Sequence, residues 1–86
     1  MAIFEETLDI LDRTLSLGGR ARRFSRETRL LGSLPELDSM AVVAIITGLE
    51  ERFGFEVLDE EISADTFESV GSLVQLVETK LANAPS

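Results

Sequence analysis

Residues 34–40 read Leu-Pro-Glu-Leu-Asp-Ser-Met, and they fix where a helix can begin. Pro35 restrains its own φ angle and pushes Leu34 toward extended conformations, so we do not expect a helix to run through this point. Asp38 and Ser39 are both favourable N-cap residues, and an apolar pattern of helical period starts directly after them. The stretch therefore predicts either an ordinary helix cap or a serine hydroxyl at a helix start, where a phosphate group is stabilised.

Three segments of the chain have the apolar periodicity of amphipathic helices. They cover residues 3–17, 39–53 and 70–82; Gly18-Gly19 and Gly54 are expected to end the first two, and Ser69 to cap the third. Gly48 inside the second helix indicates a close approach by another helix. The expected core stripes are Phe4, Leu8, Leu11 and Leu15, then Val42, Ile45, Ile46, Leu49 and Phe53, then Val70, Leu73, Val74, Val77 and Leu81.

The segments between the three expected helices are predicted to be less regular than the helices. Residues 18–38 are expected to form a long loop that could contain a short turn of helix at 25–29, and residues 55–58 an extended segment. Residues 59–63 are expected to form a short helix or a single turn that carries Ile62 inward, and residues 65–68 a turn that places Phe67 in the core. The sequence thus predicts an all-α fold: a small bundle of three main helices plus one short helix, as a single domain over residues 1–86.

Composition limits the chemistry available to the chain. It contains no cysteine and no histidine, which removes thiolate chemistry, the commonest general base and the commonest metal ligand. The acidic run at residues 59–61 lacks the spacing of a calcium loop, so no metal site is expected. Glu50 and Glu51 are a poor catalytic pair, because adjacent helix residues point to different sides. We expect a monomeric protein that is not an enzyme.

The N-terminus has neither the basic start nor the apolar core of a secretory signal, and no apolar run reaches the length of a membrane span. A cytoplasmic location is expected.

Charge is divided between two consecutive regions. The chain carries a net charge of −8, but residues 13–29 contain six arginines against one glutamate, and residues 36–68 contain ten acids against one arginine. This distribution argues against nucleic acid as the main partner and favours docking to basic protein surfaces. The alternative is that both regions are only solvated faces.

Several motifs together resemble those of an acyl carrier protein. They are residues 37–40 (Leu-Asp-Ser-Met), 49–53 (Leu-Glu-Glu-Arg-Phe), 59–61 (Asp-Glu-Glu) and 67–70 (Phe-Glu-Ser-Val), with Leu73. The resemblance implies that 4′-phosphopantetheine is attached to Ser39, next to Asp38, and that its thiol holds acyl groups as thioesters. It implies a phosphopantetheinyl transferase, an acyl-activating ligase and acyl-transferring or synthase enzymes with basic docking surfaces as partners.

Residues 17–20 and 31–43 are similar, more narrowly, to the carrier proteins associated with exosortase systems in Gram-negative bacteria. This implies a role near exopolysaccharide or envelope gene clusters. The chain also departs from many fatty-acid carriers: Ala41 and Ala44 stand where acids are usual, Leu58 where proline is common, and the first loop is unusually rich in arginine.

Partner docking is expected on the second helix. Met40 and Val43 would form its apolar centre, and the acidic rim would be Glu50, Glu51, Glu60 and Glu61. Two other functions fit the residues. One is a peptidyl or aminoacyl carrier of a nonribosomal pathway, and the other is a helical interaction domain without a covalent arm.

Overall fold

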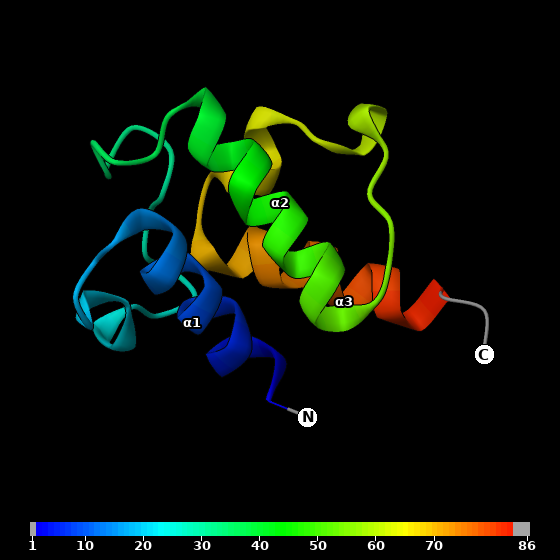
Figure 1. Cartoon of the computed structure of the whole chain (residues 1–86), viewed down its shortest axis with the longest axis horizontal. Helices are drawn as coiled ribbons and strands as arrows, with labels where there is room; N and C mark the ends of the chain where they lie inside the picture. Colours follow the sequence, from blue (N-terminus) through cyan, green and yellow to red (C-terminus); the bar gives the residue numbers. More distant parts are fainter. Residues whose placement is uncertain (1, 84–86) are drawn as a thin grey trace.

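The computed structural model describes residues 2–83 and contains three α-helices in that range: α1 (Ile3–Leu15), α2 (Ser39–Phe53) and α3 (Val70–Asn83). Three short 3₁₀ turns lie in the connections: η1 (Arg20–Arg23), η2 (Asp59–Glu61) and η3 (Ala64–Phe67). α2 crosses in front of α3, and α1 contacts both of them (Figure 1). The predicted all-α fold with three main helices is confirmed.

The core lies where the apolar stripes of the three helices meet. Ten of the predicted stripe residues are buried: Leu8, Leu11, Leu15, Ile45, Ile46, Leu49, Val70, Leu73, Val74 and Val77. Phe4, Val42, Phe53 and Leu81, toward the helix ends, are half-buried. Leu30, Leu37 and Phe67 add buried side chains from the connections. Since each buried Leu, Val or Phe side chain contributes about 1.5–3 kcal/mol, this shared core is the main stabilising term.

α1 ends two residues earlier than the predicted 3–17. Ser16 takes a left-handed conformation with φ 54°, and its N–H donates to the Asp12 carbonyl. Leu17 then turns inward and is 3% exposed. The prediction that Gly18-Gly19 ends the helix was therefore wrong in position, because the chain has already left the helix to bury Leu17.

η1 lies where only an irregular loop was expected. The Asp12 carboxylate accepts the N–H of Gly19 at 2.9 Å and the N–H of Ala21 at 3.1 Å, so one side chain of α1 holds the turn. Ala21 is 1% exposed and anchors η1 to the core. Residues 25–29 contain a hydrogen-bonded turn rather than a helix, with the Thr28 N–H donating to the Ser25 carbonyl at 3.1 Å.

The rest of the long loop pairs with the start of α3. The N–H groups of Val70 and Gly71 donate to the carbonyls of Thr28 and Arg26, at 2.9 and 2.8 Å. The Ser69 hydroxyl accepts the Ser72 N–H at 3.2 Å, which confirms Ser69 as the cap. The first N–H groups of a helix have no partner within the helix, so the loop satisfies donors that would otherwise be unpaired.

Between α2 and α3, the segment predicted at 59–63 as a short helix or a single turn is a single 3₁₀ turn, η2, which spans three residues; Ile62 follows it half-buried. Residues 55–58, predicted to be extended, have no helical or strand structure, and Leu58 has extended backbone, with φ −83° and ψ 151°. Phe67 at the end of η3 is 2% exposed. α3 runs one residue past the predicted end at 82. The sequence also predicts that residues 82–86 fray, and residues 84–86 of this segment lie outside the described residues.

Candidate functional site

Ser39 is the first residue of α2, and Asp38 is its cap. Asp38 has extended backbone, with φ −111° and ψ −175°, and its Oδ1 accepts the Ala41 N–H at 2.8 Å. The Asp38 carbonyl accepts the Val42 N–H at 3.0 Å, which opens the helical hydrogen-bond series. Because Asp38 takes the capping role, the Ser39 side chain is not needed as a cap.

The Ser39 side chain is exposed, and its hydroxyl makes no hydrogen bond within residues 2–83. Met40 and Val43 beside it are also exposed, at 81% and 64%. Residues three or four apart on a helix are neighbours, so Val43 lies next to both Ser39 and Met40 on one side of α2. The structure thus brings together a free hydroxyl and the two predicted apolar docking residues, with nothing covering them.

The segment before the site is held from two directions. Leu37 is 7% exposed and packs into the core. A guanidinium nitrogen of Arg20 in η1 lies 2.6 Å from Glu36 Oε2. This hydrogen bond, with help from a backbone N–H, lowers the pKa of Glu36 below its usual value. Sequence reasoning missed this link, because no local pattern connects two residues sixteen positions apart.

The four predicted acidic docking residues are not equivalent. Glu50 Oε2 accepts the Val57 N–H at 2.7 Å, and Glu61 Oε1 accepts the Leu58 N–H at 2.9 Å and lies 3.0 Å from the Lys80 ammonium. The backbone N–H of Leu58, followed by Lys80, lowers the pKa of Glu61. Glu51 and Glu60 are exposed, and their carboxylates make no hydrogen bond or ion pair within residues 2–83.

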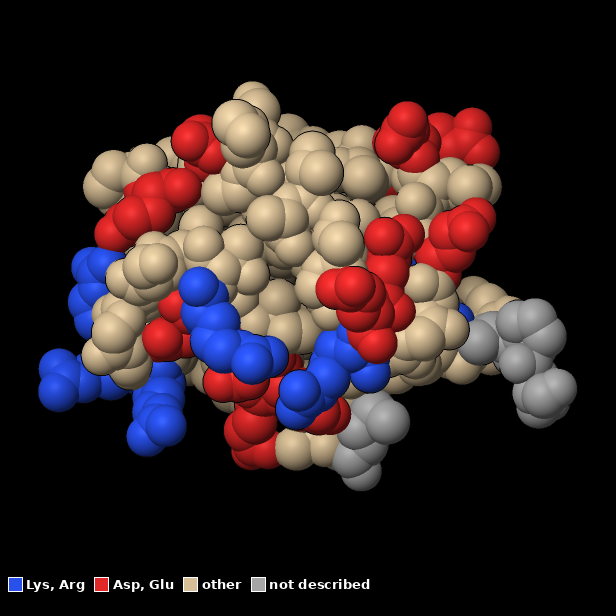
Figure 2. Space-filling model, viewed as in Figure 1, with Lys and Arg blue, Asp and Glu red and all other residues tan. Residues whose placement is uncertain are grey.

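The acids are separated from Ser39 along the molecule. Asp59 and Glu60 belong to η2, which lies at the upper right of the molecule, whereas α2 begins at the upper left (Figure 1). The space-filling view shows acidic side chains gathered on that side of the molecule, with uncharged surface between them and the start of α2 (Figure 2). The acids of η2 therefore lie farther from Ser39 than Met40 and Val43 do.

No helix in residues 2–83 has both the length and the apolar character needed to cross a bilayer. In the same residues, no group of three or more Asp and Glu side chains is arranged to hold a metal ion.

Known proteins with similar sequences share one description. The chain is 32% identical over 79 residues to an acyl carrier protein of Wolinella succinogenes, covering 92% of this chain and 97% of the relative. It is 35% identical over 83 residues to an acyl carrier protein of Helicobacter acinonychis, covering 95% and 100%. No protein-family model matches the chain.

A solved structure agrees in fold and in sequence. The solution NMR structure of a holo acyl carrier protein from Nitrosomonas europaea superposes with a TM-score of 0.89 at 52% identity, covering 96% of this chain and all of the other. None of these three descriptions mentions an exosortase system, so the narrower subgroup stays a prediction. Near full-length similarity to these relatives, together with the same helical arrangement, shows that the chain belongs to the acyl carrier protein family.

Proposed function

We propose that Ser39 is the attachment point of a 4′-phosphopantetheine arm and that the chain is a non-catalytic carrier. The observation that supports this most directly is the free Ser39 hydroxyl, which is exposed at the start of α2 while Asp38 performs the capping. A modifying enzyme can approach such a hydroxyl without rearranging the helix. The solved neighbour is described as a holo acyl carrier protein, which supports the same assignment.

The residues around Ser39 suit the proposed group. The start of α2 carries backbone N–H groups at the positive end of the helix dipole, which stabilises a phosphodiester there. Asp38 orients the first turn through its bond to the Ala41 N–H. When attached, the arm supplies a thiol that holds acyl groups as thioesters. The chain itself only presents the arm on a rigid helix and binds the enzymes that use it.

Met40 and Val43 are proposed to be the apolar centre of the surface that docks these enzymes. Both are exposed next to Ser39, so an enzyme that approaches the Ser39 hydroxyl comes into contact with them. The partners would be the phosphopantetheinyl transferase, an acyl-activating ligase, and acyl-transferring or synthase enzymes with basic surfaces. Apolar centres with charged surroundings are typical of such transient interfaces.

A catalytic role for the glutamates of α2 receives no support from the geometry. Glu50 Oε2 accepts the Val57 N–H at 2.7 Å, so this carboxylate holds the segment after α2 in place. The relatives are described as acyl carriers, which does not favour the peptidyl carrier or the armless interaction domain.

The test is to incubate the purified protein with coenzyme A and a broad-specificity phosphopantetheinyl transferase, and then to measure its intact mass. Ser39 Oγ would attack the pyrophosphate phosphorus of coenzyme A that bears the pantetheine, forming the Oγ–P bond and breaking the phosphoanhydride bond. 3′,5′-ADP leaves, and the hydroxyl proton passes to the transferase. We expect the mass to rise by one phosphopantetheinyl group. Ser39→Ala should show no gain, whereas Ser33→Ala, which removes an exposed serine of the loop, should be modified like the parent. An unchanged parent mass, or a gain that persists in Ser39→Ala, would refute the proposal.

A further inference from the structure

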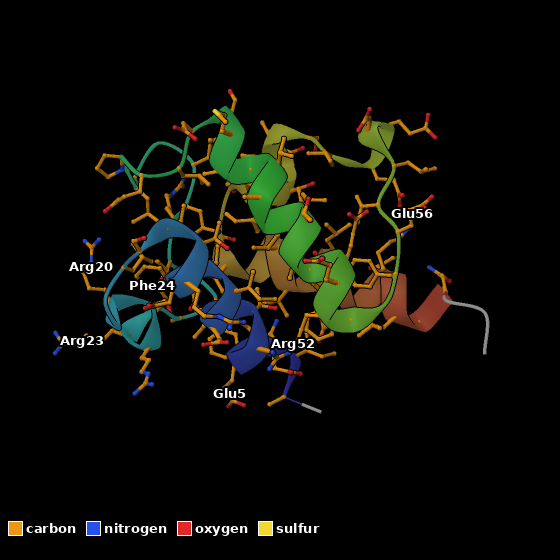
Figure 3. The ribbon with its side chains drawn as sticks, in the orientation of Figure 1. Glu5, Arg20, Arg23, Phe24, Arg52 and Glu56 are labelled. Atoms are coloured by element: carbon orange, nitrogen blue, oxygen red, sulfur yellow. The ribbon has the colours of Figure 1, made fainter. Side chains whose placement is uncertain are left out.

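η1 presents arginines that the fold does not use. Three of its four residues are arginine: Arg20, Arg22 and Arg23, which we call the basic face. Arg20 pairs with Glu36, but Arg22 and Arg23 are exposed and make no ion pair or side-chain hydrogen bond within residues 2–83. Figure 3 shows Arg20 and Arg23 pointing outward from η1, away from the helices.

The basic face is rigidly held. Both oxygens of Asp12 accept backbone N–H groups of η1 or of the residue before it, and Ala21 is buried against the core. The Arg20 Nε also donates to the Leu17 carbonyl at 3.1 Å. Two free guanidinium groups on a fixed backbone lose less conformational freedom on binding than they would on a mobile loop.

A hollow of about 610 Å³ adjoins the basic face, between α1 and η1. Its apolar walls come from Phe4 and Leu8, and Arg22 lies at its edge. Three carboxylates also line its wall: Asp12 is bonded to η1 and Asp9 lies 3.4 Å from Arg13, which reduces their repulsion of a negative ligand. The third, Glu5, makes no ion pair within residues 2–83 and points down from α1, to the right of η1, in Figure 3. The hollow can accept an apolar side chain while Arg22 meets a charge beside it.

This surface lies away from the acidic docking residues. η1 and η2 are at opposite ends of the long axis of a molecule that measures 35 Å along it (Figure 1). Figure 2 shows arginines at the lower left, over η1, and the acids of η2 at the upper right, with further acids above the arginines and at the bottom of the molecule. At physiological salt, charges interact over only about 8 Å, so a partner at η1 responds to the charges around η1 rather than to the net charge of the molecule.

We propose that the basic face and its hollow form a second docking surface, which binds an acidic protein segment carrying an apolar side chain. Arginine favours carboxylates because its planar guanidinium binds them in a bidentate manner. A protein segment fits better than an anionic membrane, because the large apolar residues that are exposed in residues 2–83 are Leu31, Met40, Val43 and Leu58, none of them in η1. The inference does not depend on modification of Ser39.

The test is an NMR titration of the ¹⁵N-labelled protein with the synthetic peptide Glu-Glu-Leu-Phe-Glu-Glu. We expect the largest amide shifts at Leu8 and Ala21, and a dissociation constant about tenfold higher in the double variant Arg22→Gln, Arg23→Gln. The matched control Arg29→Gln, Arg52→Gln removes the same charge elsewhere and should change affinity less than about twofold. A peptide with glutamine in place of glutamate should bind at least about tenfold more weakly.

The contrary outcomes are distinct. Absence of peptide binding, shifts centred on α2, or an equal loss in the control variant would overturn the proposal. Sedimentation with phosphatidylglycerol vesicles that requires Arg22 and Arg23, without peptide shifts, would overturn it in favour of a lipid surface. Repeating the titration with Ser39→Ala should give the same affinity. Absence of peptide binding would therefore not count against attachment at Ser39, and absence of attachment at Ser39 would not count against peptide binding.

Discussion

At the scale of single residues, the acidic side chains of this carrier have different roles, although the sequence alone does not distinguish them. Glu50 and Glu61 accept backbone N–H groups at 2.7 and 2.9 Å, whereas Glu51 and Glu60 face solvent without a partner in residues 2–83. An acid that holds the fold cannot be removed as a neutral test of docking. The docking role predicted for all four therefore has to be tested on Glu51 and Glu60.

The lowered pKa of Glu61 predicts how the free energy of unfolding changes as the pH falls. Its pKa is lowered in the folded state by the Leu58 N–H and by Lys80, so its charged form stabilises the fold above the ordinary value of 4.5. This contribution is lost as pH falls below that value and through the lowered folded pKa. In Glu61→Gln, the free energy of unfolding should be lower at neutral pH and should decrease less between about pH 5 and pH 3.

Urea denaturation across this pH range, followed by circular dichroism, measures the effect. Glu60→Gln is the control: it changes the adjacent carboxylate, which makes no hydrogen bond within residues 2–83, and should keep the parent's slope. If the free energy of unfolding had the same pH slope in Glu61→Gln and in the parent, the contacts of Glu61 with the Leu58 N–H and Lys80 would not contribute to the pH dependence of stability.

At the scale of elements, the three helices followed from the sequence because their information is local. A stripe of period 3.6 and a cap such as Asp38 are visible within one segment, and α2 was predicted with both of its ends correct. η1 could not be predicted in this way. It depends on Asp12 reaching seven and nine residues ahead to Gly19 and Ala21, which no local pattern encodes.

The same reasoning applies to the candidate site. The Ser39 position and the exposure of Met40 and Val43 follow from sequence and helix geometry, but the Arg20–Glu36 link and the internal use of Glu50 and Glu61 do not. Those bonds join segments whose approach is decided only when the core packs. Long-range pairs are therefore the part of the site that requires the structure.

The junction between the long loop and α3 gives a prediction at this scale. A Cβ on Gly71 would lie 2.9 Å from the Arg26 carbonyl oxygen, a backbone atom whose hydrogen bond to the Gly71 N–H keeps it close. Gly71→Ala should therefore lower the free energy of unfolding by about 1–3 kcal/mol, measured by urea denaturation.

Gly48→Ala is the matched comparison. Its Cβ would lie 3.1 Å from Ile10 Cγ2, a side-chain methyl that has to move by only a few tenths of an ångström, and alanine is favoured over glycine in a helix by about 1 kcal/mol. We expect a net change within about 1 kcal/mol of zero. A larger loss for Gly48→Ala than for Gly71→Ala would mean that the α1–α2 contact, and not the loop junction, is the tighter one.

At the scale of the whole molecule, the charges are not spread evenly: arginines gather around η1 and acids around η2, while further acids lie on α1 and beside the start of α2. The basic face lies at one end and η2 at the other (Figures 1 and 2). Two such ends allow the carrier to meet partners of opposite charge without competition for one surface. If net charge controls the rate at which an enzyme modifies the carrier, replacing arginines should raise that rate. If only charges near the contact matter, the same replacement should leave the rate almost unchanged, so the two cases can be distinguished.

Removing Glu51 and Glu60 as glutamines changes the net charge from −8 to −6, and removing Arg22 and Arg23 changes it to −10. If a modifying enzyme with a basic surface responds to net charge, the arginine variant should be modified faster than the parent. Because steering acts through charges near the contact, we expect instead that Glu51→Gln, Glu60→Gln lowers kcat/KM for phosphopantetheinylation about threefold or more, and that Arg22→Gln, Arg23→Gln changes it less than about twofold. In about 1 M salt the three rates should converge, since screening then acts within about 3 Å. Faster modification of the arginine variant at low salt would show that the enzyme senses the molecule's total charge and that its two ends are not separate surfaces.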